Sequence, residues 1–261
     1  MGSGGRWEVE HSEVWARRAR SFGAEAAAYD QHRPDYPMAG VRWALEPLGD
    51  KDDAEVLDLG AGTGKLTGVL LAAGARVRAV EPDDAMRATL AARYPEVPAL
   101  AGTAESIPLP DDSVDAVLAG QAFHWFDLPR AFPELARVLR PGGVVAAFWN
   151  THDSSVDWVA ELDRISLTRL SFRRFPGDGL PSHALFHPFE QREFAHSQRR
   201  TAESLAATIG THSTSLVVTP AERGELLDRI TGYLRSRPET GSGEFEIPLR
   251  TKVVRATIRP A

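Results

Sequence analysis

The sequence predicts an α/β fold in which a mostly parallel β-sheet carries helices on both faces. Short apolar segments alternate with segments of helix length between residues 54 and 150, a pattern typical of parallel sheets. The first apolar segment runs into a glycine-rich turn that leads directly into a helix. The alternation stops after Asn150, so we expect the chain that follows to begin with an insertion.

Local signals place the elements of this alternating region. Asp83 is an N-cap candidate for the helix after it, and Pro141-Gly142-Gly143 is expected to stop a helix ahead of the next strand. The expected strands are 56–59, 76–80, 97–101, 114–119 and 144–149, and the expected helices are 65–73, 83–94 and 128–139.

The flanking regions carry weaker patterns. Apolar residues recur at helical spacing over residues 11–30, and Pro34 and Pro37 end that helix because a proline restricts the residue before it. Pro220 suits the first position of a helix, where its missing N–H costs nothing. The other expected elements are a short helix at 38–48, a partly helical and then irregular insertion at 151–185, strands at 189–199 and 244–258, and helices at 202–209 and 220–235.

Composition narrows the class of protein. The chain of 261 residues is long enough for one large domain, and its net charge of −6 is spread over both signs, so we expect no nucleic-acid partner. The absence of cysteine excludes disulfides, thiolate metal sites and thiol catalysis. No segment has the roughly 20 apolar residues of a membrane span or the form of a signal peptide, so we expect a cytoplasmic protein with no membrane partner.

The stretch EVLDLGAGTGK at residues 55–65 is the strongest candidate for a binding site. Gly60, Gly62 and Gly64 allow positive φ angles and a close approach to a ligand, while the next helix directs its first N–H groups to the same place. Glu81 ends the following strand, where a carboxylate can accept hydrogen bonds from ribose hydroxyls. These residues suit a nicotinamide dinucleotide or an adenosyl cofactor, and a tight turn without a ligand is the remaining alternative.

Asp58 helps to choose between the two cofactors. In a dehydrogenase the pyrophosphate lies on this turn, and a carboxylate just before the first glycine would add negative charge beside two phosphates. A cationic amine or sulfonium at the same place would be attracted by it. The residue therefore favours S-adenosylmethionine, although a buried Asp58 that only ties down the loop is an alternative.

Four motifs in register strengthen this interpretation, and they resemble the class I S-adenosylmethionine-dependent methyltransferases, specifically the methyltransferase type 11 branch. They are VLDLGAGTGKLT at 56–67, VRAVEPDDAM at 77–86, GTAESIPLPDDSVDAVLAGQAFHWFD at 102–127 and RVLRPGGVVAAFWN at 137–150. Within that branch, YDQHRPDYP at 29–37, AFHWFD at 122–127 and FEIPLRTKVVRA at 245–256 look like trans-aconitate methyltransferase-like proteins.

The resemblance implies an architecture. It implies a Rossmann-like sheet of seven strands whose last strand is antiparallel, within a single domain over residues 1–261. The implied parts are N-terminal lid helices at 1–50, a cofactor-binding core at 51–150, a substrate-cap insertion at 151–188 and the C-terminal part of the sheet at 189–261.

The resemblance also implies roles for individual residues around S-adenosylmethionine. The glycine turn would hold the methionine half, Glu81 the ribose, and the lid the carboxylate or the mouth of the site. The implied cofactor-binding residues are Tyr29, Arg33, Asp58, Gly60, Ala61, Gly62, Gly64, Glu81, Pro82, Thr103, Ala104, Glu105 and Gln121, and Tyr36 is a lid residue that could cover the substrate. For Arg33, a surface pair with Asp35 is the alternative to a carboxylate clamp.

His124 is the candidate catalytic residue, because it follows the fourth strand and its pKa suits proton removal near neutral pH. A histidine that fixes the loop by a hydrogen bond is the alternative. Phe123 and Trp125 could form the acceptor pocket or simply pack. Arg169, Arg173, Arg174, His183 and His187 could form an anionic pocket or be solvated, and no metal site is expected because no acidic partner stands at ligand spacing.

The function predicted on these grounds is methyl transfer from S-adenosylmethionine, with S-adenosylhomocysteine as product, to a small organic molecule. Oxygen in a carboxylate or hydroxyl is the expected acceptor, with nitrogen or carbon as alternatives. The rival classes are a nicotinamide oxidoreductase and an adenosyl-binding module without turnover. The chain is expected to act as a monomer or homodimer.

Overall fold

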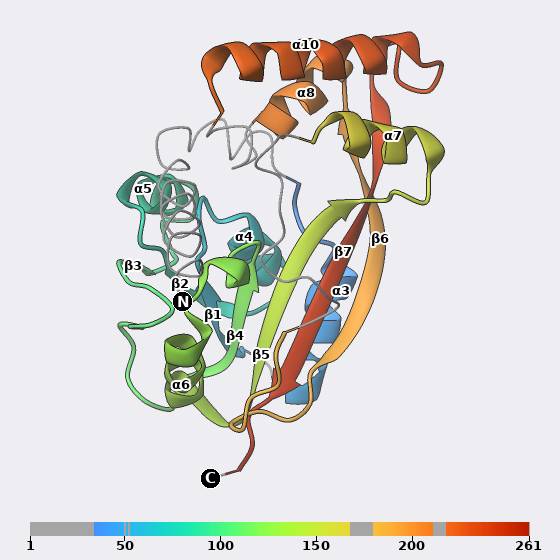
Figure 1. Ribbon diagram of the computed structural model, residues 1–261. Coiled ribbons are helices and arrows are strands. Elements are labelled where there is room, and N and C mark those ends of the chain that lie inside the picture. The colour runs from blue at the N-terminus through green and yellow to red at the C-terminus, as the bar shows by residue number, and fades with distance from the viewer. Residues whose placement is uncertain (1–33, 50, 52, 168–179, 211–217, 261) are drawn as a thin grey trace, which may run out of the picture. The chain divides into compact units, whose positions relative to one another are not determined.

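A computed structural model describes residues 34–49, 51, 53–167, 180–210 and 218–260 (Figure 1). The helix expected at 11–30 and most of the expected lid lie outside these residues. Among the described helices, none is long and apolar enough to cross a membrane.

The sheet has seven strands in the order β3-β2-β1-β4-β5-β7-β6. Strands β1 to β5 pair in parallel, and β7 pairs antiparallel with β5 (Figure 1). The predicted α/β class and the antiparallel last strand are therefore confirmed. The strands are β1 (Glu55–Leu59), β2 (Arg76–Val80), β3 (Ala99–Leu100), β4 (Val114–Gly120), β5 (Leu139–His152), β6 (Glu190–Arg200) and β7 (Phe245–Thr257).

Helices cover both faces of this sheet, and the strand sequences dictate which side chain faces which helix. Successive residues of β1 alternate between two hydrophobic clusters, Val56 in one and Leu57 in the other. The Val56 cluster packs on α3 (Met38–Leu45), α4 (Lys65–Ala72) and α5 (Asp84–Arg93), whereas the Leu57 cluster packs on α6 (Leu128–Val138). The short helix η2 (Glu46–Leu48) continues α3.

Two boundaries differ from the predicted ones. Pro141-Gly142-Gly143 lies inside β5 rather than before it, because α6 ends at Val138 and the register shifts so that Leu139 opposes Val114 while Val144 opposes Ala116. The three residues thus form a bulge. Strand β3 is shorter than expected, because Val97 donates its N–H back to Tyr94 and closes a turn.

The chain divides into two compact units. The larger contains β1 to β5 and helices α3 to α6. The described residues of the smaller include the helices α7 (Asp157–Ile165), α8 (Ala202–Gly210) and α10 (Pro220–Ser236). In the smaller unit the Tyr233 hydroxyl donates to the Trp158 carbonyl at 2.8 Å. Thr219 and Glu222 cap α10 reciprocally, and Pro220 occupies its first turn as predicted. The single-domain organisation stays a prediction.

The glycine turn after β1 lies at the topological switch point of the sheet, where successive strands are added on opposite sides of β1. Strands β2 and β4 flank β1, so the ends of all three meet there. Gly60, Gly62 and Gly64 have φ angles of 69°, 57° and 89°. Gly60 donates its N–H to the Val80 carbonyl at 2.8 Å, and a Cβ added to Gly60 would lie 2.6 Å from the Ala122 Cβ. The turn therefore packs directly against the ends of its neighbours.

This packing predicts unequal effects of two similar substitutions. Gly62→Ala adds a Cβ whose nearest neighbour is the Met86 sulfur at 3.8 Å, so it should cost only the positive-φ strain of about 1 kcal/mol. Gly60→Ala adds the collision with Ala122 and should cost about 3 kcal/mol. Urea unfolding of both variants measures the difference. Equal losses would show that the turn can move away from Ala122.

Candidate functional site

The Glu81 carboxylate joins the glycine turn to the end of β2. One carboxylate oxygen accepts the N–H of Gly62 and the other accepts the N–H of Asp83, each at 2.9 Å. The side chain is buried, and burial raises its pKa above the ordinary value. Each carboxylate oxygen keeps a lone pair beyond these bonds, so Glu81 can still accept from ligand hydroxyls. Asp83 caps α5 by accepting from the N–H groups of Ala85 and Met86, as predicted.

Asp58 is buried completely at the end of β1. Its Oδ2 accepts the Thr67 hydroxyl at 2.6 Å, whereas its Oδ1 has no hydrogen-bond partner among the described residues. Burial raises its pKa from 3.8 to about 7, and the charge of Glu81 adds to this. The buried hydroxyl of Thr63, in the turn itself, also lacks a partner within the described part of the chain. Such orphaned groups require a polar partner, because an unpaired buried oxygen is costly.

Because β3 runs parallel to β2, the segment after β3 lies at the same edge of the sheet as Glu81, which follows β2. Thr103 and Ser106 form a small bridge around Ala104, which is buried, and Glu105. A Glu105 carboxylate oxygen accepts the Asp127 N–H at 2.8 Å, which fixes the segment to the start of α6. Pro82, between Glu81 and Asp83, is exposed.

Gln121 directly follows β4 in a left-handed conformation, with φ at 53°. Its N–H donates to the Phe148 carbonyl and its Nε2 to the Asn150 carbonyl, both at 2.8 Å. A side chain in this conformation is unusual outside glycine and is held here by bonds to β5. Gln121 thus lies with the glycine turn and Glu81 at the carboxyl edge of the parallel strands.

The short helix η3 (Phe123–Trp125) follows Gln121 and carries the candidate catalytic histidine. Phe123 is only 1% exposed and packs against Phe126 and Phe132, with ring centroids 5.0 and 6.2 Å away. Its position supports the packing alternative. His124 and Trp125 are half-buried, with ring centroids 4.8 Å apart.

Residues 34–36, a segment of the expected lid, lie against the ends of β4 and β5. Tyr36 is 8% exposed and packs edge-on against Phe148, and its hydroxyl lies where a Cβ on Gly120 would come within 2.6 Å. Asp35 pairs with Lys65 at 3.2 Å. Tyr29 and Arg33 lie outside the described residues.

Three polar residues at this edge were not among the predicted site residues. The Asn150 amide donates to the Asp35 carbonyl at 3.1 Å, its Oδ1 accepts the Thr251 hydroxyl, and Thr251 also contacts His196 Nε2 at 2.9 Å. A polar residue directly after the apolar run of β5 is a signal that could have identified Asn150. Thr251 and His196 carry no local signal, because they come from other strands.

The proposed anionic pocket receives little support. Arg169, Arg173 and Arg174 lie outside the described residues, and His187 is exposed. His183 stacks on Phe132 of α6, with ring centroids 4.6 Å apart and an angle of 20°. In the described ranges, no three histidine or acidic side chains are grouped as metal ligands.

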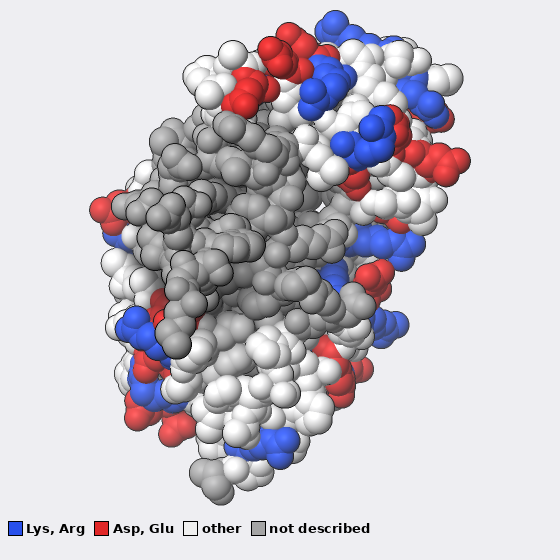
Figure 2. Space-filling model, in the orientation of Figure 1, with Lys and Arg blue, Asp and Glu red and all other residues white. Residues whose placement is uncertain are grey.

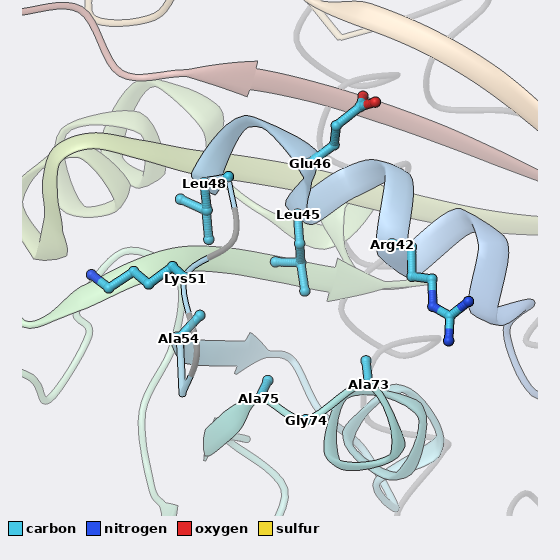
Figure 3. A pocket seen from close by; sticks show the side chains of 10 residues that line it. Arg42, Leu45, Glu46, Leu48, Lys51, Ala54, Ala73, Gly74 and Ala75 are labelled. Carbon is cyan, nitrogen blue, oxygen red and sulfur yellow. The ribbon is translucent and has the colours of Figure 1, made fainter.

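A small pocket of about 180 Å³ opens at the opposite edge of the sheet, before β1 and β2 (Figure 3). Its position separates it from the glycine turn. Arg42, Leu45, Glu46, Leu48, Gly49, Lys51, Ala54, Ala73, Gly74 and Ala75 line it. On the face drawn in Figure 2, acidic and basic side chains of the described residues are interspersed.

Comparisons with known proteins identify the family. A family model described as a methyltransferase domain matches residues 57–147. An uncharacterized methyltransferase of Mycobacterium tuberculosis is 40% identical over 245 residues, which cover 91% of this chain and 96% of that protein. A malonyl-[acyl-carrier protein] O-methyltransferase of Methylococcus capsulatus is 38% identical over 138 residues, 48% of each chain.

A solved structure agrees with these relatives. It belongs to a candidate type II methyltransferase from Anaeromyxobacter dehalogenans, with a TM-score of 0.60 and 29% identity, and the match covers 87% of this chain and 97% of that one. The fold, the matched domain and the relatives that align over nearly the whole chain lead to one conclusion: this chain belongs to the class I methyltransferase family.

Proposed function

We propose that the protein transfers a methyl group from S-adenosylmethionine to a small organic molecule. The observation that carries this proposal is the buried Asp58, whose Oδ1 faces no donor among the described residues and stands at the start of the glycine turn. A cationic ligand group supplies what that oxygen lacks. Family membership supports the same cofactor, because methyltransferases of this family generally use it.

The chemistry of Asp58 and Glu81 disfavours the rival nicotinamide cofactor. Both carboxyl groups are buried near the turn, and burial already raises the pKa of each. A pyrophosphate would bring further negative charge to this place, which would raise the cost of ionising either group. A methionine amine or a sulfonium would lower that cost.

The described residues fit the parts of such a cofactor. When bound, S-adenosylmethionine supplies a methyl group on a positively charged sulfur, ready for in-line displacement. Glu81 would accept the ribose hydroxyls, Pro82 with the Thr103–Glu105 segment would flank the adenine, and Gln121 would face the methionine end. The glycine turn contributes close backbone approach and N–H donors.

We propose oxygen as the acceptor atom, in a carboxylate or hydroxyl group. The similarity to a malonyl-[acyl-carrier protein] O-methyltransferase and the sequence resemblance to trans-aconitate methyltransferase-like proteins both support a carboxylate. A carboxylate needs no general base, because it is already deprotonated at neutral pH. Nitrogen and carbon acceptors remain alternatives, as does an adenosyl-binding module without turnover.

His124 and Trp125 are proposed to meet the acceptor. They lie in η3, directly after the strand that ends at Gly120, and are half-buried. An acceptor that still carries its proton would require a base there, and an imidazole is the suitable side chain. The net charge of −6, made up of charges of both signs, supports a small molecule over nucleic acid as the partner. We further propose a cytoplasmic location and a monomer or homodimer.

Calorimetric titration with S-adenosylmethionine, S-adenosylhomocysteine and NADH tests the cofactor. We expect micromolar binding of both adenosyl ligands and none of NADH. Glu81→Gln, which loses charge but keeps one acceptor, should weaken adenosyl binding about tenfold or more. Replacement of the exposed Glu225 of α10 in Glu225→Gln should leave binding unchanged. Binding of NADH alone would overturn the proposal.

The pKa of Asp58 predicts how cofactor binding depends on pH. Because burial raises that pKa to about 7, the free protein holds Asp58 protonated below this pH, and a cationic ligand must displace the proton. S-adenosylhomocysteine affinity should therefore fall by up to about tenfold per pH unit from pH 7 to 5.5. Asp58→Asn should bind weakly with no such slope. A flat wild-type profile contradicts a direct role for Asp58.

The two alternatives for His124 predict different acceptor profiles. We would measure S-adenosylhomocysteine formation with panels of small carboxylic acids and phenols for wild type and His124→Ala. If His124 is a base, turnover of phenols should fall about 100-fold or more while turnover of carboxylates changes little. Equal losses with both panels would instead indicate a histidine that only fixes the loop.

A further inference from the structure

Asn150 is the junction of a hydrogen-bond chain that crosses the last strands of the sheet. Its carbonyl accepts from Gln121 Nε2 at 2.8 Å, and its side-chain amide donates to the Asp35 carbonyl at 3.1 Å. Its Oδ1 accepts from the Thr251 hydroxyl, which also contacts His196 Nε2 at 2.9 Å. One residue thus contacts the end of β4, the lid segment 34–36 and strand β7.

The directions of these bonds are fixed by their chemistry. The Asn150 amide nitrogen is a donor to a backbone carbonyl, so Oδ1 is its acceptor end and must receive the Thr251 proton. Thr251 has one proton to give, so His196 Nε2 must carry its own proton and donate to the Thr251 oxygen. Each group therefore orients the next, from His196 on β6 to Asn150 at the end of β5.

Burial makes this orientation costly to lose. Thr251 is fully buried and His196 is half-buried. Removing the Thr251 hydroxyl would leave Asn150 Oδ1 and the His196 N–H without their partner in a low-dielectric environment. The Asn150 carboxamide would then be held only at its nitrogen, which donates to the Asp35 carbonyl at 3.1 Å and to the Pro34 carbonyl at 3.5 Å.

The lid segment depends on the same junction. The Asp35 carbonyl accepts a hydrogen bond from the Asn150 amide, and the Asp35 carboxylate forms an ion pair with Lys65. Lys65 is the first residue of α4, directly after the glycine turn. The pair with Lys65 is 65% exposed on the Asp35 side, so its contribution is small. Tyr36 follows and packs on Phe148. The bond from Asn150 differs from this ion pair in holding the backbone of the segment, since its acceptor is the Asp35 carbonyl.

We propose that Asn150 is a positioning residue of the cofactor site, held in orientation by Thr251 and His196. Its carbonyl fixes Gln121 in the left-handed conformation, and its amide fixes residues 34–36 over the carboxyl ends of β4 and β5. The inference rests on the proposed function, because it assigns Gln121 and the lid segment to the adenosyl pocket. Neither Thr251 nor His196 touches that pocket in this assignment; both act through Asn150.

The test compares Thr251→Val with Thr251→Ser. Valine keeps the shape but removes the hydroxyl, whereas serine keeps it. We expect Thr251→Val to weaken S-adenosylhomocysteine binding about five- to twentyfold by calorimetry and to speed hydrogen exchange in residues 34–40, with exchange in α6 unchanged. Thr251→Ser should stay within twofold of wild type in both. Asn150→Asp, which keeps the acceptor for Thr251 but loses the donor to Asp35, should reproduce the effect on residues 34–40.

The outcomes separate the two proposals. If wild type binds no adenosyl ligand, the proposed function fails and this inference fails with it. If wild type binds but Thr251→Val binds equally well and exchanges equally slowly at 34–40, the inference alone is overturned. A lower melting temperature of Thr251→Val with unchanged affinity would assign Thr251 a purely structural role and also overturn it. Should Thr251→Val not fold, unchanged affinity and exchange in Asn150→Asp would have the same meaning.

Discussion

The site depends on how closely the turn after β1 packs against the neighbouring strand ends. Gly60 binds the Val80 carbonyl on one side and leaves no room for a Cβ beside Ala122 on the other. This contact lies where the carboxyl ends of β1, β2 and β4 meet. The residues that follow these strands are therefore close to the turn: Glu81 after β2, Gln121 after β4 and the start of α4. Glycine is required here by geometry, because both the positive φ and the missing side chain are used.

Two buried carboxyl groups beside this turn work against the stability of the ligand-free protein. Asp58 keeps an oxygen without a partner among the described residues, and burial raises the pKa of both Asp58 and Glu81. A buried carboxyl group with one oxygen that receives no hydrogen bond is unfavourable for folding alone. The same arrangement favours a ligand that brings positive charge and hydroxyl donors. The residues that lower the folding stability at this site are therefore the ones suited to binding such a ligand.

Much of the core was predictable because its signals are local. The β1 turn, the Asp83 cap and Pro220 at the start of α10 each depend on residues a few positions apart. The bulge at Pro141-Gly142-Gly143 was missed because it is set by the register against β4. The Asn150 junction was missed for the same kind of reason, since Thr251 lies 101 positions away in the sequence. Phe123 packs in the core against Phe132 of α6. The sequence around Phe123 contains no local pattern that indicates this contact.

The two outer strands of the sheet limit how this protein can associate with other chains. At one margin β3 contributes only two residues, and at the other β6 is long but carries exposed charges such as Arg192 and Glu193. Short or charged edge strands resist pairing with a strand from another molecule, which is a common route to aggregation. A homodimer of this protein would therefore be expected to use helical or loop surfaces and not a continuous intermolecular sheet.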